Sequence, residues 1–322
     1  MNTHVMSYLD SHEYTFDMAK EFFEKMKLDE QGYTCKPINI TEFRRFHDLY
    51  GSCMHEDEGY GYLKDVGATL YGIIHDEDKE LVGIISCESI DISTKNNSII
   101  HMTYADFLAI HPDYRKKGLI KYLQRQSWIY THENNNEGLI MQTAKSTKID
   151  HTVAYKKNLY SVHLKNSTFM NLDRKLLKTS SSHSELRIPT MDELRKLNEK
   201  RYDFQIIYND VQLKAMLNNY ICRIDKNGNL FVFVRFVNKG KLADAFTLVL
   251  INYYIMNKES FKESFIEIGN EMRKKIHMIS ILNNDVIDAL SGVYYEKNTE
   301  LSVYILMSSR HARANNSLVN LR

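Results

Sequence analysis

The stretch of this 322-residue sequence best suited to chemistry is Arg115-Lys116-Lys117-Gly118. It follows an apolar segment, residues 105–110, and precedes a segment whose apolar residues have helical spacing. The first amides of a helix lack intrahelical partners and carry a partial positive charge, so they favour phosphate. Three cationic side chains add to this preference, and Gly118 lets a ligand approach the backbone. The pattern predicts a phosphate-binding turn, although an exposed basic helix start would have the same composition.

A strand and a helix must position this basic turn. Residues 105–110 are apolar except for Asp106 and predict a buried strand. Pro112 has no N–H for a strand ladder and moves His111 away from helical geometry. We therefore expect the strand to end there, with His111 as a turn residue rather than an acid–base group. After the turn, one face of the predicted helix carries Ile120, Leu123, Ser127 and Tyr130.

A second group of charged residues lies upstream, at Glu56-Asp57-Glu58. Two glycines follow: Gly59 precedes Tyr60, and Gly61 lies between Tyr60 and Tyr62. Because glycine loosens the backbone, these residues predict a flexible acidic loop. Such a loop is either a solvated surface segment or a clamp for a basic peptide, and the residues alone leave both interpretations open.

The rest of the pattern predicts alternating strands and helices. A helix at about Phe16–Met26 precedes one that Thr41 caps and that extends to about Cys53, with an apolar stripe of Phe43, Phe46, Leu49 and Tyr50. Residues 152–157 predict a short helix, and 160–172 a strand region. The other predicted strands are 69–74, 81–87, 101–110, 138–143, 230–237, 243–256, 277–282 and 301–307, and further helices begin near 191, 211, 262 and 285.

A polar, serine-rich stretch divides this pattern into two halves with a similar order of elements. Residues 178–185, KTSSSHSE, contain no large apolar residue. We therefore expect two domains, 1–177 and 187–322, joined by a linker at 178–186. The first alone has an Arg-x-x-Gly turn, so the ligand is expected to bind there.

The composition argues against several classes of protein. The net charge of +1 disfavours nucleic-acid binding as the main task. The four cysteines form no CxxC pair and predict reduced thiols in an intracellular protein, with no metal site. No segment approaches the roughly 18 apolar residues of a membrane span, and the first ten residues lack the features of a signal peptide. We expect a cytoplasmic protein without a membrane span.

The basic turn resembles the acyl-CoA signature of the GNAT superfamily, Arg/Gln-x-x-Gly-x-Gly/Ala. The match, Arg115-x-x-Gly118-x-Ile120, departs from it at the last position. Over residues 40–322 the chain resembles the N-myristoyltransferase family, whose members consist of two fused GNAT-like halves. The family's Glu-Ile-Asn-Phe-Leu-Cys-Val-His reads here as Tyr104–His111, and its Leu-Val-Gly-Phe-Ile-Ser as Leu81–Ser86. Its acidic loop and its Thr-Ala pair are matched by residues 56–62 and 143–144.

This resemblance implies an α/β (α+β) fold with two GNAT-like halves in a pseudo-twofold arrangement, as mixed sheets flanked by helices. It implies transfer of a myristoyl group from myristoyl-CoA to the N-terminal glycine amine of proteins that have a nearby lysine. The enzyme would be a monomer from a divergent, viral branch and would need no metal. Two alternatives stay open: a GNAT-type amine N-acetyltransferase, and an inactive relative that binds acyl-CoA or glycine-terminated peptides.

The resemblance also implies roles for particular residues. The backbone amides of Phe107 and Leu108 would stabilise the thioester oxyanion. The base would be the terminal carboxylate, here on Arg322, with help from Thr143 and from Asp106, which replaces an Asn of the family. Coenzyme A would bind at Ala109, Ile110, Arg115, Lys116, Lys117, Gly118, Leu119 and Ile120. The peptide would bind at Glu56, Asp57, Glu58, Tyr60 and Tyr62. Two departures bear on substrate specificity: Lys297-Asn298-Thr299 replaces a Gly-Asp-Gly, and Lys145 replaces a glycine.

Overall fold

The computed structural model describes most of the chain, and the fold is given for these residues. They are 32–51, 53–55, 57–93, 96–144, 153–163, 185–202, 204–238, 246–272, 276–281, 284–291, 296–307 and 319–320. The predicted helix at 16–26 and most of the predicted linker at 178–186 lie outside them.

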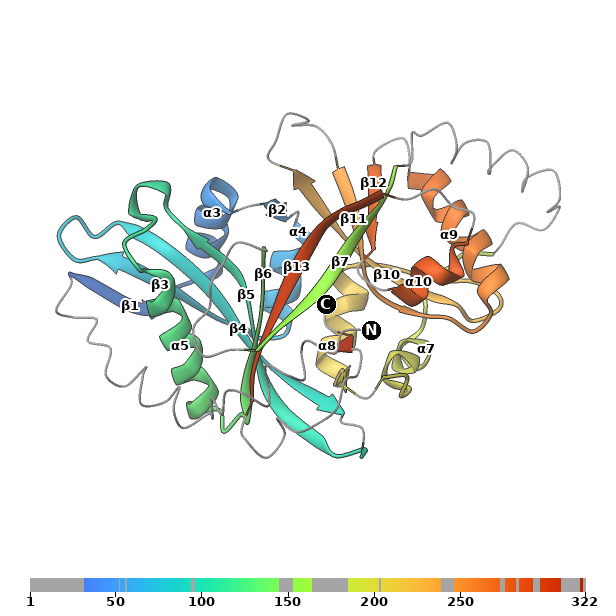
Figure 1. Cartoon of the computed structure of the whole chain (residues 1–322), viewed down its shortest axis with the longest axis horizontal. Coiled ribbons are helices and arrows are strands. Elements are labelled where there is room, and N and C mark those ends of the chain that lie inside the picture. The colour runs from blue at the N-terminus through green and yellow to red at the C-terminus, as the bar shows by residue number, and fades with distance from the viewer. Residues whose placement is uncertain are drawn as a thin grey trace.

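A mixed sheet extends through the molecule and contains strands from both halves of the chain (Figure 1). From one edge to the other, its strands are β1 (Tyr33–Pro37), β3 (Thr69–His75), β4 (Leu81–Ser93), β5 (Ile99–Ile110), β6 (Gly138–Ala144), β13 (Glu296–Met307), β7 (Val153–His163), β12 (Ile276–Ile281), β11 (Phe246–Tyr254), β10 (Leu230–Asn238) and β2 (Cys53–His55). Three short strands pair with it off this path: β8 (Phe204–Ile207), β9 (Ile221–Ile224) and β14 (Val319–Asn320).

Helices flank this sheet, which confirms the expected α/β class. In the first half, α5 (Ile120–Glu133) packs on one face of β3–β5, in a core cluster with Val82 and Ile85. The opposite face carries Ile84 and Ala109 and is covered by α3 (Ile40–Tyr50) and α4 (Asp57–Asp65). The second half contains α7 (Met191–Leu194), α8 (Asp210–Asn219), α9 (Lys258–Met272) and α10 (Asn284–Ala289).

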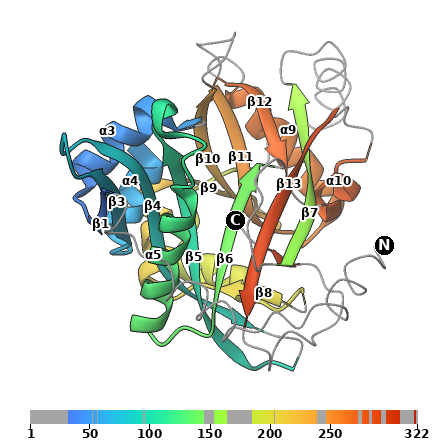
Figure 2. The ribbon, with the colours of Figure 1, turned by 60° about the vertical axis from the view of Figure 1, so that its left-hand side comes forward.

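The strand order repeats in reverse about the central pair of β13 and β7 (Figure 2). β4 and β5 pair antiparallel, and α5 then connects β5 to β6, which runs parallel to it. Likewise β10 and β11 pair antiparallel, and α9 connects β11 to the parallel strand β12. Beside these units, β13 pairs with β6 and β7 pairs with β12. Each half therefore contributes a strand to the other, in the expected pseudo-twofold arrangement.

The prediction of a short helix at residues 152–157 is wrong. These residues enter β7, which begins at Val153 and pairs with β13 over most of its length. The last four residues of β7 also pair with β12 on the other side. Pairing to neighbours more than a hundred residues away overrides the local pattern, as is common for strands.

The first helix of the described chain begins two residues earlier than predicted, and Thr41 does not cap it. Asn39 is the cap, because its side chain accepts the Glu42 amide at 2.9 Å while Glu42 reaches back to it. The helix ends at Tyr50 rather than near Cys53. Leu49, placed in the apolar stripe, is 61% exposed.

Cys35, Cys87 and Cys222 are free thiols, as predicted. Burial raises the pKa of Cys87 to about 12, so this thiol stays protonated and unreactive. Among the described residues, no helix has the length and apolar character that crossing a membrane requires.

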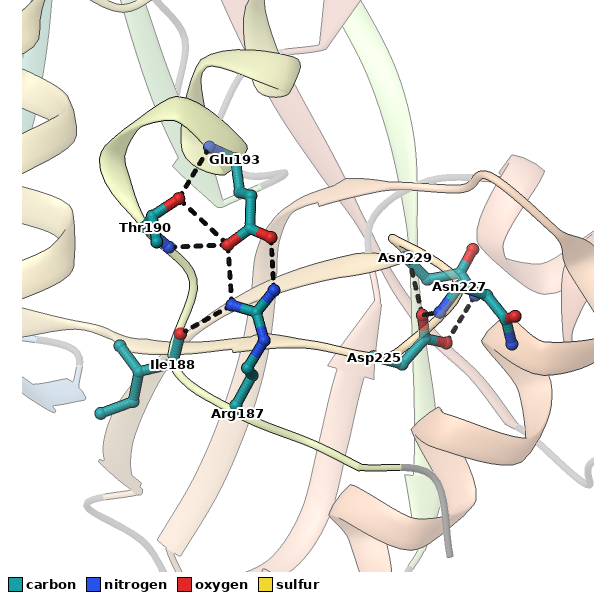
Figure 3. A network of polar contacts seen from close by, with 7 residues as sticks. All are labelled: Arg187, Ile188, Thr190, Glu193, Asp225, Asn227 and Asn229. Carbon is teal, nitrogen blue, oxygen red and sulfur yellow. Dashed lines mark hydrogen bonds and ion pairs between the residues drawn. The ribbon is translucent and has the colours of Figure 1, made fainter. Parts of the chain in front are cut away.

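A polar network connects the turn of the β9–β10 hairpin to the residues just before α9, and Figure 3 shows its hairpin part, Asp225, Asn227 and Asn229. The Asp225 carboxylate accepts the backbone amides of Asn227 and Asn229, both at 2.9 Å. The side chain of Asn229 donates to Asp225 at 2.6 Å, and its oxygen accepts the amides of Met256 and Asn257 at the start of α9. One asparagine side chain therefore satisfies three separate backbone or carboxylate groups in the interior.

Replacing this asparagine should be costly. Asn229→Ala should lower the free energy of unfolding by about 2–4 kcal/mol, because it leaves the part-buried amides of Met256 and Asn257 without an acceptor and removes a buried donor from the Asp225 carboxylate. Asn227→Ala is the matched control, since Asn227 is exposed and contributes its backbone amide to the network; it should cost no more than about 0.5 kcal/mol. Urea unfolding measures both, and equal losses would contradict the role of Asn229.

Candidate active site

A β-bulge interrupts the pairing of β4 with β5 inside the predicted reaction stretch. The register shifts between Ile84 and Ser86, so that Phe107 and Leu108 together stand opposite the single residue Ile85. Bulges redirect backbone groups and are frequent beside active sites. Phe107 has a φ of 56°, in the left-handed region that non-glycine residues seldom adopt.

On its other side, β5 separates from β6 at the same level. The pairing of these two strands ends at Ala105 and Met141. β6 continues to Ala144 with β13 as its partner. From Asp106 onward, β5 and β6 no longer pair within the described chain, so both ladders of β5 change at one point.

Asp106 and Ser86 take over part of the interrupted ladder. The Asp106 carboxylate accepts the Phe107 amide at 2.8 Å. The Ser86 hydroxyl donates to the backbone oxygen of Asp106 at 3.0 Å. Asp106 is half-buried and lies next to the bulge. Its carboxylate, however, occupies one of the two amides that the resemblance assigns to the oxyanion.

The basic turn connects the end of β5 to α5 as predicted. Lys116 and Gly118 both have left-handed backbone, with φ of 65° and 79°. No atom lies within 4 Å of a Cβ added to Gly118, so the backbone there is open to a ligand. α5 begins at Ile120 without a side-chain cap. Among the described residues, no hydrogen-bond acceptor is recorded for the amides of 116–119, which suits an anion.

The cationic side chains of this turn are not equivalent. Arg115 folds back, and its Nε donates to the Ile110 carbonyl at 3.2 Å. The Lys117 ammonium lies 4.3 Å from the ring centroid of Tyr114. Desolvation and the carboxylates of Asp78 and Glu80 raise the pKa of Tyr114 to about 12, so the phenol stays neutral. The Lys116 side chain is exposed.

His111 is a turn residue, as predicted. Its Nδ1 accepts the Asp113 amide at 3.3 Å, which caps the 3₁₀ turn at Pro112–Tyr114. Its ring also packs edge-on against Tyr50, with the centroids 4.3 Å apart. These contacts give His111 a structural role.

The prediction of a flexible acidic loop at 56–62 is wrong. Residues from Asp57 onward form α4, whose first turn contains Asp57 and Glu58. Acidic residues stabilise this end of a helix. The carboxylate of Glu58 accepts the backbone amide of Arg235 at 3.1 Å and its Nε at 2.6 Å, and Asp57 forms an ion pair with Arg44. Both acids therefore have arginine partners in this chain.

The two tyrosines of this segment are buried rather than presented to solvent. Tyr60 is 3% exposed and packs in the core cluster beneath α3. Tyr62 is 1% exposed, and its hydroxyl donates to Glu88 at 2.9 Å. Residues two apart on a helix point to different sides, so Tyr60 packs in the cluster with α3 and Tyr62 in the cluster with α8.

Glu56 and Arg322 lie outside the described residues. Thr143 is described as backbone alone, in β6 opposite Ser302 of β13. Lys297 and Thr299, at the replaced glycine motif, lie in β13 on either side of a register shift.

Sequence reasoning missed the polar partners that surround α4. Glu88 is 6% exposed and accepts a hydrogen bond from Gln212 at 2.8 Å as well as from Tyr62. A charged residue inside the apolar run 81–92 was a usable signal for it. No local pattern could indicate the contact of Glu58 with Arg235, since the two residues are 177 positions apart in the sequence.

Comparison with known proteins relates the chain to acyltransferases. No family model matches the sequence. A protein of Melanoplus sanguinipes entomopoxvirus with the provisional name glycylpeptide N-tetradecanoyltransferase is 29% identical over 199 residues, 60% of this chain. The chain spans 57% of the length of that relative.

Solved structures give the fold. N-myristoyltransferase of Saccharomyces cerevisiae, with bound myristoyl-CoA, has a TM-score of 0.66 over 86% of this chain and 83% of that one, at 14% identity. A GCN5-related N-acetyltransferase from Kribbella flavida has a TM-score of 0.52 over 87% and 72%, at 10% identity. These likenesses concern the fold, and they confirm the resemblance to N-myristoyltransferases.

The Glu58–Arg235 contact should contribute measurably to stability. Glu58→Gln should lower the free energy of unfolding by about 1.5–3 kcal/mol, because hydrogen bonds to charged groups are stronger than neutral ones. Asp57→Asn makes the same change on the same helix at an exposed side chain, and should cost less than about 1 kcal/mol. A double-mutant cycle of Glu58→Gln with Arg235→Met, measured by denaturant unfolding, should show coupling. A coupling energy near zero would contradict the contact.

Proposed function

We propose that this protein transfers a myristoyl group from myristoyl-CoA to the N-terminal glycine amine of substrate proteins. The observation that carries the proposal is the arrangement on β5. A bulge at residues 107–108 coincides with the separation from β6, and the basic turn follows within a few residues. One strand thus offers backbone groups to a reacting carbonyl and leads to a turn suited to phosphate. The similarity to the named entomopoxvirus protein supports this reaction over others that use the same fold.

Coenzyme A is expected to bind along the end of β5 and the start of α5. Lys116, Lys117 and the amides of 116–119 are suited to its phosphates, since helix N-termini and cations both favour anions. Ala109 and Ile110 on the strand, with Leu119 and Ile120 at the helix start, complete the proposed site. Arg115 contributes chiefly by holding the turn against the Ile110 carbonyl.

The reaction forms an amide and breaks a thioester. The glycine nitrogen attacks the thioester carbon, negative charge develops on the carbonyl oxygen, and coenzyme A leaves as its thiol with a proton. The amides of Phe107 and Leu108 are the proposed donors to that oxygen, and fixed donors of this kind are worth roughly 3–4 kcal/mol each. Because Asp106 accepts the Phe107 amide at 2.8 Å, its carboxylate must turn away before this amide can act.

The amine must also lose a proton, since an amino terminus has a pKa of about 8 and is mostly protonated at neutral pH. If the Asp106 carboxylate turns from the Phe107 amide toward the ammonium, it releases that amide for the oxyanion and accepts the proton of the amine. We therefore assign Asp106 as a base. The family resemblance implies that Thr143 and the terminal carboxylate of Arg322 also take part in removing this proton.

The substrate peptide is expected to lie near the start of α4. The Asp57 side chain is 84% exposed, and its pair with Arg44 is of the weak, solvated kind. A lysine a few residues past the substrate glycine can therefore compete for Asp57, with Glu56 beside it in sequence. Glu58 is committed to Arg235 and supports α4 instead. We also propose that the enzyme is monomeric, cytoplasmic and of viral origin, and that its products are lipoproteins.

A series of acyl-CoA esters tests the proposal against its alternatives. The protein is incubated with a lysine-containing peptide that begins with glycine and with esters of two to sixteen carbons. A maximum near fourteen carbons supports myristoyl transfer, and acetyl transfer alone supports an N-acetyltransferase, which the likeness to the Kribbella flavida enzyme favours as second candidate. Binding without product indicates an inactive relative. The same peptide with N-terminal alanine is the control for glycine selectivity.

The proposed phosphate turn can be tested at Lys116. Lys116→Gly removes the charge and keeps the left-handed backbone, so the KM for acyl-CoA should rise by about three- to tenfold, more at low salt than at high salt. Lys79→Gly is the matched control, because Lys79 is also exposed with a φ of 62° but lies in the β3–β4 turn. An unchanged KM in Lys116→Gly would argue against phosphate binding at this turn.

The proposed base can be tested by pH dependence. Asp106→Asn should lower kcat by about a hundredfold at pH 7, because the ammonium loses its proton acceptor. The defect should shrink as the pH rises above about 8, where the amine is already neutral. Asp113→Asn, an exposed carboxylate in the following turn, should leave the profile unchanged. A pH–rate profile of Asp106→Asn that matches the wild type would assign proton removal to another group.

A further inference from the structure

Phe107 holds a backbone conformation that its side chain disfavours. Its φ of 56° is strained for a bulky residue. Such conformations persist where the surroundings determine them, and they concentrate at functional sites. Whatever holds Phe107 therefore also decides where the amides of the bulge point.

Three aromatic rings from two helices enclose the Phe107 ring. The ring centroids of His47, Tyr60 and Phe43 lie 5.1, 5.9 and 6.0 Å from that of Phe107. All three pairs are tilted, within the range of favourable aromatic contacts. His47 and Phe43 come from α3, and Tyr60 comes from α4. These three residues are called the ring clamp below, and each is at most 3% exposed.

Within the ring clamp, Tyr60 connects α4, on which it lies, to α3. Its hydroxyl donates to the Asp48 carboxylate at 2.7 Å and lies 2.9 Å from Nδ1 of His47. The Arg44 guanidinium lies 5.3 Å from the Tyr60 ring centroid and pairs with Asp57 at the start of α4. The Tyr60 ring is therefore held by the hydrogen bond of its hydroxyl, by the Arg44 guanidinium over its face, and by the ion pair that joins α4 to α3.

The same helix connects Tyr60 to the second half of the chain. Two residues before Tyr60, Glu58 holds both the amide and the guanidinium of Arg235 on β10. A displacement of α4 from β10 would therefore move Tyr60 against Phe107. This path consists of packed rings and charge-assisted hydrogen bonds, without a flexible link.

We infer that Tyr60 is a positioning residue of the acyl-transfer site. Through the ring clamp it holds Phe107 in the left-handed conformation and so aims the amides of Phe107 and Leu108. The catalytic consequence rests on the proposed function, whereas the conformational one does not. The resemblance assigned Tyr60 to the substrate peptide; here its buried ring acts on the bulge instead.

Three variants separate this role from a general contribution to stability. Tyr60→Leu removes the ring, and Tyr60→Phe keeps the ring but removes the hydroxyl. Phe46→Leu is the matched control: Phe46 is also buried in the core cluster of α3, and its ring contact is with Tyr50 at 4.8 Å rather than with Phe107.

Steady-state kinetics with myristoyl-CoA and a glycine-terminated peptide give the first measurement. Tyr60→Leu should lower kcat by about ten- to a hundredfold and leave both KM values within about twofold, because misaimed donors affect the transition state alone. Tyr60→Phe should restore kcat to within about threefold of the wild type, as should Phe46→Leu. Equal losses of kcat in Tyr60→Leu and Phe46→Leu would overturn the inference.

Amide hydrogen exchange gives a measurement that does not depend on activity. In Tyr60→Leu, residues 105–110 should exchange about tenfold faster relative to α9, and in Phe46→Leu this ratio should stay at its wild-type value. If the wild type transfers no acyl group while the exchange result holds, the proposed function fails and the ring clamp stands. Unchanged exchange at 105–110 in Tyr60→Leu would overturn the ring clamp itself.

Discussion

Strand β5 must keep its backbone groups satisfied where the pairing with both of its neighbours changes. The register with β4 shifts by one residue at the bulge, and β6 stops pairing with β5 while it keeps β13 as its other partner. The sequence compensates with two side chains, since Ser86 supplies a donor to the Asp106 carbonyl and Asp106 supplies an acceptor to the Phe107 amide. Buried backbone groups are seldom left without partners. An interrupted ladder that is repaired by side chains can be opened again by a ligand, which a continuous ladder cannot.

The central unit of the fold was predictable because its signals are local. An apolar run predicts β5, Pro112 ends it, and helical spacing predicts α5, all within about thirty residues. The strand β7 was not predictable in this way. Its partners, β13 and β12, come from the other half of the chain, and no window around Val153 contains them.

The acidic segment shows why part of the candidate site escaped prediction. Glycines among acids and tyrosines predict a loop, and each glycine costs a helix about 1 kcal/mol. That cost is offset by burial of Tyr60, Tyr62 and Leu63 in two core clusters, and by ion pairs of the first turn with Arg44 and with the distant Arg235. Similarly, the bond from the Phe107 amide to Asp106 depends on a φ angle that residue types do not reveal. The residue types indicated which segments carry reactive groups, but tertiary contacts decide which of these groups can bind a substrate or cofactor.

The exchanged strands have a consequence for how the protein is made. β6 ends at Ala144, yet its outer partner β13 begins at Glu296, so a ribosome must add about 150 residues before that edge is covered. During synthesis at about 5–20 residues per second, the first half therefore waits for about 8–30 seconds with an open strand. Open edges recruit other chains. The nascent first half therefore presents an unpaired strand edge until the second half is made and covers it.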